Sequence, residues 1–269
     1  MTDTKPNERQ CCICLGTMAP FAEAKVLHRY TVSYFRCESC GFVQTEPPYW
    51  LDEAYGEAIA RSDVGLVSRN QRLAIHTRAL IAAFFDPAGR FLDYAGGYGL
   101  FTRMMRDAGL DFYHWDSYCP NLFAQQFKGD PTKARGCYEL VTAFEVLEHL
   151  LDPVQEVERL LQMTDSLLFT TLLLPSHVPK PGTWWFYGLE HGQHVSIYSS
   201  VTLARMADRL GVSLLSDGAW LHLFTRKKLS RPLFGLVSRY KVALLVAATG
   251  RRKSLIPADY ESVTGSKLE

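Results

Sequence analysis

The stretch FLDYAGGYGLFTR, residues 91–103, gives the clearest indication of the fold of this chain. Arg90–Tyr94 is a short apolar run typical of a buried strand, and Leu100–Ala108 has the apolar spacing of a helix that ends at Gly109. The glycine-rich run Ala95–Gly99 lies between them. The order strand, glycine loop, helix predicts an α/β unit whose loop approaches a bound ligand.

An acidic residue follows at the position that such a unit requires. A second strand-like run, Asp111–Trp115, ends in Asp116, about twenty residues beyond the loop. In a doubly wound sheet this carboxylate lies at the C-terminal edge of the neighbouring strand, where two ribose hydroxyls can donate to it. Loop and acid together predict an adenosine-containing cofactor.

The composition of the loop separates a dinucleotide from S-adenosylmethionine. Gly97 and Gly99 are two residues apart, and no third glycine follows at the spacing that best holds a pyrophosphate. Asp93, at the strand end, would repel a pyrophosphate but favours a cationic sulfonium and amino group. The loop therefore favours S-adenosylmethionine.

These residues resemble the first motif of the class I S-adenosylmethionine-dependent methyltransferases, acidic-x-Gly-x-Gly-x-Gly. Asp93, Gly97 and Gly99 match it, and Ala95 replaces the first glycine. A methyl side chain is tolerable there at negative φ, but it intrudes at positive φ or where a ligand approaches very closely. The replacement at Ala95 therefore bears on one contact with the cofactor and not on the assignment of the whole loop.

The segment ELVTAFEVLEHLLDP, Glu139–Pro153, resembles the fourth-strand motif of the same family. Read alone, AFEVLEHL is better explained as a core-facing helix. Asp152-Pro153 favours the start of a helix, and further strands are expected at 166–174, 212–216 and 219–225. The resemblance covers about residues 65–225 and implies an α/β fold, a doubly wound Rossmann-like seven-stranded methyltransferase sheet.

The resemblance also assigns cofactor positions. Ala95, Gly96, Gly97 and Gly99 approach the methionine half of S-adenosylmethionine, and Asp116 approaches the ribose. The residues that flank the adenine or the sulfonium are Ser117, Phe144 and Glu145. Phe101 is either a further contact or a core residue.

Four of the seven cysteines form two Cys-x-x-Cys pairs, Cys11/Cys14 and Cys37/Cys40. Two such knuckles joined by a hairpin are typical of a zinc ribbon, whereas a redox-active or fortuitous pair is the alternative. Four thiolates leave no open coordination position, so the expected Zn²⁺ is structural. The chain is similar, more narrowly, to bacterial methyltransferases that carry an N-terminal zinc ribbon and act on sugars or other small metabolites.

A loop dense in aromatic residues and histidines, 175–198, is expected after the fifth strand, where a base for the acceptor is needed. His194 is the first candidate base, His191 the second, and Glu190 their orienting partner, because histidine titrates near neutral pH. The alternative is that these histidines are structural. His149 also matches the family motif and is expected at a helix start near the cofactor, where a structural role is the alternative. Three aromatic residues, Trp184, Trp185 and Tyr187, either stack on an acceptor or close a core.

The chain is divided by these signals into a zinc ribbon (1–48), a helical linker or lid (49–86, with Tyr55 and Arg69 to Arg72), a methyltransferase domain (87–228) and a basic helical tail (229–269). Between Arg226 and Lys253 there are nine Lys/Arg and no Asp/Glu. This segment suits acidic lipid, a phosphorylated substrate or a partner chain, and an ordinary solvated helix face is the alternative.

The N-terminus, the length of the apolar runs and the net charge predict where the protein is located and which partners it has. The N-terminus lacks the apolar core of a secretory signal, which predicts a cytoplasmic protein, and no apolar run reaches the roughly 20 residues of a transmembrane helix. The formal net charge of +1 gives no global reason to expect nucleic acid.

The function expected from all this is methyl transfer from S-adenosylmethionine to a small-molecule acceptor, with a saccharide or nucleotide-sugar favoured. An RNA methyltransferase that uses the ribbon and the tail for nucleic-acid binding is the alternative. A third hypothesis is a non-enzymatic module whose altered loop no longer binds the cofactor.

Overall fold

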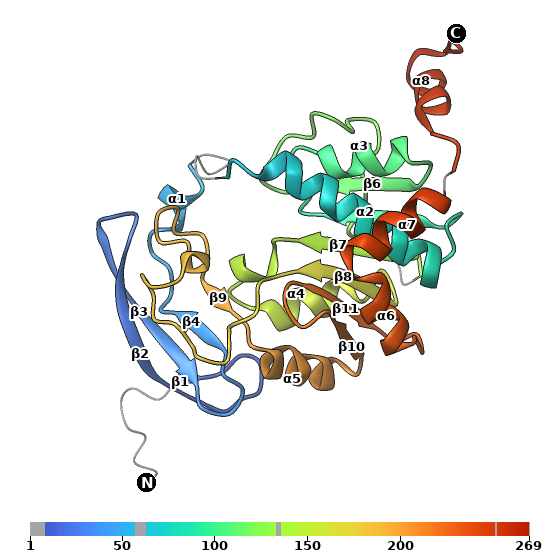
Figure 1. Cartoon of the computed structure of the whole chain (residues 1–269). Helices are drawn as coiled ribbons and strands as arrows, with labels where there is room; N and C mark the ends of the chain where they lie inside the picture. The colour runs from blue at the N-terminus through green and yellow to red at the C-terminus, as the bar shows by residue number, and fades with distance from the viewer. Residues whose placement is uncertain (1–8, 57–62, 133–135, 251, 269) are drawn as a thin grey trace.

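Two β-sheets lie side by side in the computed structural model, which describes residues 9–56, 63–132, 136–250 and 252–268 (Figure 1). Parts of the expected ribbon (1–8), lid (57–62) and tail (251 and 269) fall outside these ranges. The strands are β1 (Arg9–Gln10), β2 (Thr17–Val26), β3 (Tyr30–Cys37), β4 (Val43–Thr45), β5 (Arg90–Tyr94), β6 (Asp111–Trp115), β7 (Leu140–Phe144), β8 (Ser166–Thr170), β9 (Ser196–Ile197), β10 (Ser213–Ser216) and β11 (Leu221–Thr225). The α-helices are α1 (Leu51–Ala54), α2 (Leu66–Phe84), α3 (Leu100–Asp107), α4 (Pro153–Leu160), α5 (Ser200–Leu210), α6 (Arg231–Val237), α7 (Tyr240–Thr249) and α8 (Ile256–Thr264), and Leu147–His149 and Trp185–Tyr187 are short 3₁₀ helices.

The larger sheet has the order β10-β11-β8-β7-β5-β6. Its four strands β6, β5, β7 and β8 are parallel, and β11 and β10 extend it antiparallel. Successive residues of β5 point to opposite faces, so Phe91 packs with α2 and α3 while Leu92 packs on the side of α4 and α5. Helices therefore cover both faces, as a doubly wound sheet requires.

The expected seventh strand is represented by a single parallel bridge, His114 to Lys128, beside β6. The segment between β6 and β7 carries Pro120, Gly129 and Pro131 and has no apolar run of strand length. Since proline cannot donate to a ladder, the described part of this segment forms turns in place of a strand. Six strands and one bridge are close to the expected seven.

AFEVLEHL does not form the core-facing helix considered above. β7 ends at Phe144, Glu145 has φ 55°, and only Leu147–His149 forms a 3₁₀ turn. Helix α4 then begins after Asp152, whose side chain accepts from Gln155 N, as the Asp-Pro pair predicts.

The smaller sheet has the order β1-β2-β3-β4-β9 and is antiparallel throughout. β2 and β3 form the hairpin that the sequence predicts between the two cysteine pairs. Its last strand, β9, comes from the loop after β8, far along the chain, so Val43 of β4 pairs with Ile197 of β9. The ribbon is thus joined by strand pairing to the domain that contains the larger sheet.

A second joint holds the cysteine knuckles against α5. Ser199 is the N-cap of this helix, and Ser199 Oγ and Thr202 Oγ1 donate to the carbonyl oxygen of Cys40 at 2.8 and 2.9 Å. Arg209 of α5 also donates to the carbonyl oxygens of Cys12 and Ile13. The metal-binding end of the ribbon and the first turn of α5 are therefore one packed unit.

The basic tail folds into α6, α7 and α8, with α7 packed along α2 (Figure 1). Arg78 of α2 donates to the carbonyl oxygen of Ala247 at 2.7 Å. Within the ranges that the structure covers, no single helix is long and apolar enough to cross a membrane, and α6 and α7 pass that test only as a pair bent by 89°.

Candidate active site at the carboxyl edge of the larger sheet

The loop between β5 and α3 has a left-handed backbone at three positions. Ala95 has φ 54°, Gly97 has φ 59° and Gly99 has φ 84°. An added Cβ at Gly96 would lie 2.2 Å from Asp93 Oδ2, so this glycine is required by the packing beneath the loop. An added Cβ at Gly97 meets no atom within 4 Å, which shows open space on the outer side of the loop. The loop therefore has the shape and the free side that a bound ligand needs.

Asp93 lies beneath this loop and is 2% exposed. Its two carboxylate oxygens accept from Thr142 Oγ1 at 3.0 Å and from Thr102 Oγ1 at 3.1 Å. The pKa of Asp93 is raised to about 7, mainly by burial and to a small extent by the nearby Asp116, while the hydrogen bonds from Thr142 and Thr102 oppose the rise. In this structure Asp93 ties β5, β7 and α3 together, and its contact with the cofactor stays a prediction.

Asp116 lies at the end of β6, next to the loop. Its Oδ2 accepts from Gly97 N at 2.8 Å, and its Oδ1 accepts from the backbone amides of Tyr118 and Cys119 at 2.7 and 2.8 Å. A carboxylate has about four acceptor positions, so three bonds leave room for a further donor. The acid that the sequence predicts for the ribose is therefore held against the loop with acceptor capacity to spare.

The other predicted cofactor residues are distributed between the edge and the core. Ser117 is exposed, and Phe144 is half-buried at the end of β7. Glu145 Oε1 accepts from Thr170 Oγ1 at 2.7 Å. Phe101 is 2% exposed and packs edge-on against Phe144, so its ring is in the core, the alternative that the sequence left open.

Three histidines gather where β7 and the 175–198 loop meet. The ring of His194 lies 5.0 Å from that of His149 and 4.8 Å from that of His191, both edge to face. His194 Nδ1 lies 2.6 Å from the carbonyl oxygen of Phe186 and so carries the proton. Burial lowers the pKa of His149 to about 4 and lowers those of His191 and His194 below their ordinary value. The first two base candidates are thus neighbours in one neutral cluster with His149.

Tyr55 links this cluster to the cofactor edge. Its hydroxyl lies 3.1 Å from His149 Nδ1, and its ring stacks on that of Tyr118 with centroids 5.4 Å apart. Tyr118 N in turn donates to Asp116. The side chain expected to belong to a lid therefore lies between Tyr118, which follows the acid predicted to bind the ribose, and the histidines.

The rest of the 175–198 loop divides between core and surface. Glu190 is exposed, and no hydrogen bond joins it to His191 or His194, although its charge acts on the pKa of His191. Tyr187 is 1% exposed, and its hydroxyl donates to the carbonyl oxygen of Pro179. Trp184 is half-buried, whereas Trp185 is 72% exposed. Of the three aromatic residues, Trp185 has the most surface free to stack on an acceptor.

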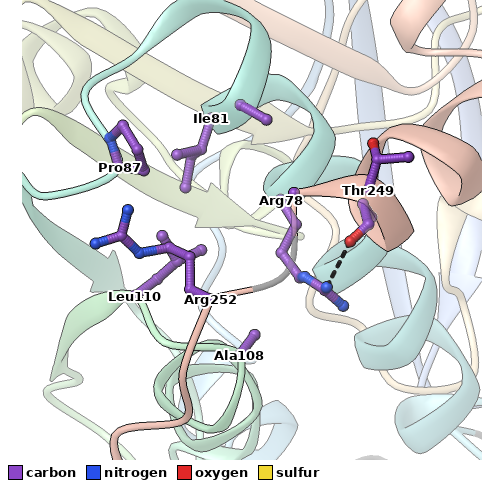
Figure 2. A pocket seen from close by; sticks show the side chains of 10 residues that line it. Arg78, Ile81, Pro87, Ala108, Leu110, Thr249 and Arg252 are labelled. Atoms are coloured by element: carbon purple, nitrogen blue, oxygen red, sulfur yellow. Dashed lines mark hydrogen bonds between the residues drawn. The ribbon is translucent and has the colours of Figure 1, made fainter.

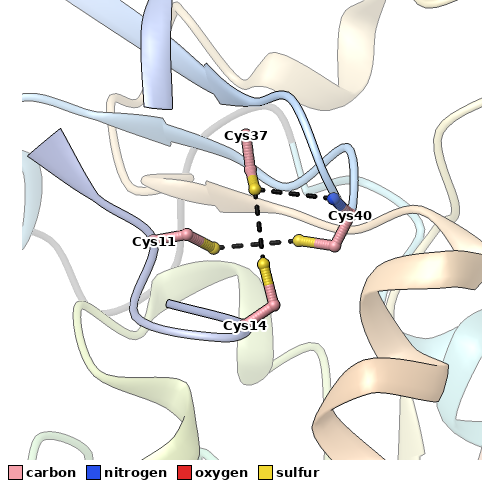
Figure 3. Close-up of side chains that lie close together, drawn as sticks. All are labelled: Cys11, Cys14, Cys37 and Cys40. Carbon is pink, nitrogen blue, oxygen red and sulfur yellow. Dashed lines mark hydrogen bonds between the residues drawn. The ribbon is translucent and has the colours of Figure 1, made fainter. Parts of the chain in front are cut away.

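The four cysteines converge on one point (Figure 3). Cys11 Sγ lies 3.7 Å from Cys40 Sγ, Cys14 Sγ lies 3.4 Å from Cys37 Sγ, and all four sulfurs lie within 4.8 Å of one another. Four thiolates around a tetrahedral Zn²⁺ have sulfurs about 3.8 Å apart, given a Zn–S bond of about 2.3 Å. The cluster can hold a zinc ion with no further ligand.

A cavity of about 300 Å³ lies away from these residues, between α2, α7 and the turns before β5 and β6 (Figure 2). Pro87 and Leu110, which precede β5 and β6, line it together with Arg78 and Arg252. It is therefore at the amino edge of the sheet, opposite the glycine loop.

Residues 66–217 match the family described as methyltransferase domain, which is more than half of the chain. No curated protein matches the chain. Among solved structures, an O-methyltransferase family 2 protein from Planctomyces limnophilus, in complex with apigenin, is 16% identical with a TM-score of 0.43, over 65% of this chain and 66% of that one. A 1,6-didemethyltoxoflavin-N1-methyltransferase from Burkholderia thailandensis is 10% identical with a TM-score of 0.47, over 74% of this chain and 96% of that one.

The chain therefore belongs to the methyltransferase domain family. This confirms the expected fold class and the expected enzyme class, a methyltransferase that uses S-adenosylmethionine. The match spans about two thirds of the first solved structure, so the acceptor and the activity of the whole chain are matters of proposal.

Two residues of the site escaped the sequence reasoning. Tyr118, which stacks on Tyr55, has no signal beyond its position after Asp116. Glu148 lies within the Glu139–Pro153 motif and has no signal of its own, yet its side chain is fully buried among the residues of the site. Its burial depends on the turn after β7 and on the returning 175–198 loop, and the local sequence encodes neither.

Proposed function

We propose that this protein transfers the methyl group of S-adenosylmethionine to a small-molecule acceptor bound between the glycine loop and the histidine cluster. The observation that carries this proposal is the continuous series of contacts from Asp116 through Tyr118 and Tyr55 to His149 and His194. It joins a cofactor edge to a cluster of proton-accepting groups. That juxtaposition is what methyl transfer to a hydroxyl or amine requires.

The bound donor supplies a methyl group made electrophilic by its sulfonium. The acceptor atom forms a bond to the methyl carbon, the carbon–sulfur bond breaks, and the electron pair stays on sulfur. The chain holds the donor with residues 95–99 and Asp116. A histidine of the cluster takes the acceptor proton, with His194 the first candidate and His191 the second.

A saccharide or nucleotide-sugar is the acceptor class we favour. Trp185 is exposed and packs against Phe186, whose ring lies 4.8 Å from that of His194. A tryptophan face beside the reacting groups suits the apolar face of a sugar ring. Strand β4 of the ribbon pairs with β9 of the 175–198 loop, so the ribbon packs beside this loop. An edge that is occupied in this way favours a small acceptor over RNA.

The test is methyl transfer to a panel of nucleotide-sugars, flavins and structured RNA, followed by mass spectrometry. We expect a methylated small molecule, and we expect the Trp185→Ala variant to raise KM for it with unchanged affinity for S-adenosylmethionine. A variant of the base should lower kcat by about 10²- to 10⁴-fold. Methylation of RNA alone, or no binding of S-adenosylmethionine in calorimetry, would contradict the proposal.

The tail is a candidate for peripheral contact with anionic lipid. Exposed apolar side chains of α6 and α7, among them Leu236, Leu244 and Leu245, lie near exposed Arg231 and Lys241. Vesicles containing phosphatidylglycerol should bind the protein in low salt, and the Arg231→Glu/Lys241→Glu variant should bind them less. Equal binding to neutral vesicles would assign this face to ordinary solvation.

A further inference from the structure

A buried carboxylate without a partner lies inside the site. Glu148 is 0% exposed, and neither Oε1 nor Oε2 has a hydrogen-bond partner within the described structure. Burying a carboxylate in this state is costly unless a cation or a hydrogen-bond donor compensates it. The Thr171 hydroxyl, also without a hydrogen-bond partner in the described structure, acts on this carboxyl group, but one hydroxyl cannot satisfy two carboxylate oxygens. The position therefore has room for a cation.

Two histidines face this carboxylate. Glu148, His149 and His194 each offer a ligand atom, and these three atoms all lie within 4.8 Å of one another. The residues come from the turn after β7 and from the end of the 175–198 loop. His194 lies 45 residues beyond His149, so the fold and not a local motif brings it to the adjacent pair Glu148-His149.

The hydrogen bond of His194 prepares it for coordination. Its Nδ1–H donates to the carbonyl oxygen of Phe186 at 2.6 Å, which leaves the lone pair on Nε2. A metal-binding histidine commonly donates its other ring N–H to a carbonyl or carboxylate in this manner. The ring of His149 is also oriented by a hydrogen bond, since its Nδ1 lies 3.1 Å from the Tyr55 hydroxyl.

The nearest cation is already engaged. Arg69 acts electrostatically on Glu148, but its two terminal nitrogens bind Asp63 at 2.8 and 2.7 Å. No hydrogen bond joins Arg69 to Glu148 among the placed side chains. Burial and the neighbouring Glu145 raise the pKa of Glu148, and Arg69 does not offset this with a direct contact. The carboxyl group of Glu148 is therefore available to a different cation.

We propose that Glu148, His149 and His194 bind a divalent transition-metal ion. Two imidazoles and one carboxylate suit Zn²⁺, Mn²⁺ or Fe²⁺ and leave coordination positions open, in contrast to the closed four-cysteine site. The role of this ion rests on the function proposed above: it binds the acceptor oxygen and lowers the pKa of its hydroxyl. His194 is then a ligand, and the base is His191.

The experiment is a titration with MnCl₂ of protein that carries one Zn²⁺ per chain, in the four-cysteine site, followed by electron paramagnetic resonance of the free Mn²⁺. Mn²⁺ is the probe because thiolate sites select zinc, whereas carboxylate suits Mn²⁺. Wild-type protein should take up one Mn²⁺ per chain. Glu148→Gln and His194→Ala should each weaken this binding by more than about 100-fold, since loss of an outer partner alone costs about 10- to 100-fold.

His191→Ala is the matched control, because its ring touches that of His194 but it is not among the three ligands. It should keep the Mn²⁺ affinity of wild type. Thermal unfolding of every variant verifies the fold, and Glu148→Gln should unfold no lower than wild type without Mn²⁺, because the unpaired charge is gone. Absence of Mn²⁺ uptake by wild type, or unchanged uptake in both ligand variants, would overturn the inference.

The two proposals fail separately. Methyl transfer that persists at the wild-type rate in protein containing only the four-cysteine zinc would overturn the metal's role and leave the methyltransferase proposal standing. Mn²⁺ uptake that needs Glu148 and His194, in a protein that does not bind S-adenosylmethionine, would support the metal site and contradict the proposed function.

Discussion

The strained residue of the glycine loop is Ala95. Its φ of 54° is the left-handed conformation, which costs an L-residue roughly 1–2 kcal/mol relative to the right-handed one. Such strain persists where the surrounding structure fixes the backbone, and it is concentrated at functional sites. Glu145, at the end of β7, has the same feature with φ 55°. Two neighbouring strands of the sheet thus end in strained residues that face one edge.

Ala95→Gly should stabilise the protein by about 1 kcal/mol. Glycine adopts this φ without the steric conflict of a Cβ atom, but the greater conformational entropy of glycine in the unfolded chain offsets part of the gain. Urea unfolding measures the stability, and calorimetry measures whether the affinity for S-adenosylmethionine rises with it. Gly97→Ala is the matched reverse change, since its φ is 59° and an added Cβ there has open space. We expect it to destabilise by a similar amount; equal stability of all three proteins would show that the loop adapts.

Asp93→Asn tests the buried carboxylate beneath the loop. A folded-state pKa of about 7, above the ordinary 3.8, means that stability is highest below pH 3.8 and is lost as the pH rises through 7. Asn removes this penalty and keeps hydrogen bonds to Thr102 and Thr142. The variant should therefore be more stable than wild type, by at most about 4 kcal/mol above pH 7 and by less as the pH falls toward 4.

Thermal unfolding between pH 4 and pH 8 checks this expectation, with Asp107→Asn, an exposed carboxylate on α3, as the control. A constant difference across that range would show that Asp93 does not carry the shifted charge. An accompanying loss of affinity for S-adenosylmethionine would add a direct contact with the donor to its structural role.

At the scale of elements, the ribbon and the 175–198 loop are mechanically joined. β4 pairs with β9, and Trp50 Nε1 donates to the carbonyl oxygen of Gly192 at 2.8 Å. Gln193 Nε2 donates to the carbonyl oxygen of Ala54 at 2.7 Å. His191 and His194 lie on either side of these contacts. The position of the base candidates thus depends on strand β4 of the ribbon and on Trp50 and Ala54, which directly follow the ribbon.

Removal of zinc by a strong chelator, or Cys37→Ser, should therefore lower methyl transfer although the cysteines lie outside the site. Hydrogen exchange at residues 191–199 should rise, because β9 loses the strand that pairs with it. Cys137→Ser is the control, since this cysteine is not in the metal cluster. Unchanged exchange in the metal-free protein would show that the hairpin holds its place without the ion.

The elements could be predicted where the signal is local. β5 and β6 have the predicted bounds, since each is an apolar run next to a glycine or an acid. α3 ends at Asp107, just before the predicted Gly109, which has φ 85°. β8 is shorter than the run 166–174, and β9 was not expected, because a two-residue strand has no periodicity of its own.

The site was predictable only where residues share a motif. The loop and Asp116 meet because parallel strands end at one edge, and the cysteines meet because their spacing requires it. The pairing of His194 with His149, and the burial of Glu148, result from the path of the 175–198 loop. No local sequence pattern predicts the path of this loop.

At the scale of the molecule, the C-terminal helix is held to the methyltransferase domain by a buried ion pair. Asp259 of α8 accepts from Arg106 Nη2 at 2.6 Å and from Arg106 Nε at 2.9 Å, with both side chains less than 10% exposed. Arg106 also binds Asp111 at the start of β6. The tail is therefore anchored on α3, the helix that starts at the glycine loop.

Asp259→Ala should destabilise the protein by about 3 kcal/mol, because it leaves a buried guanidinium with one carboxylate in place of two. Urea unfolding measures the loss, and Glu261→Ala, an exposed residue of the same helix, is the control. A loss below that of the control would mean that α8 detaches easily and that Arg106 is satisfied by Asp111 alone.

The pairing of β4 with β9 has a consequence for how the chain folds. About 150 residues separate Gln44 from its partner Ser196, so closing this contact is entropically slow compared with forming the β2–β3 hairpin. During synthesis the ribbon emerges first, and the free edge of β4 waits until residue 197 has left the ribosome. Zinc that binds early would keep this edge folded yet unpaired, which makes nascent chains most prone to mispairing with one another at that stage.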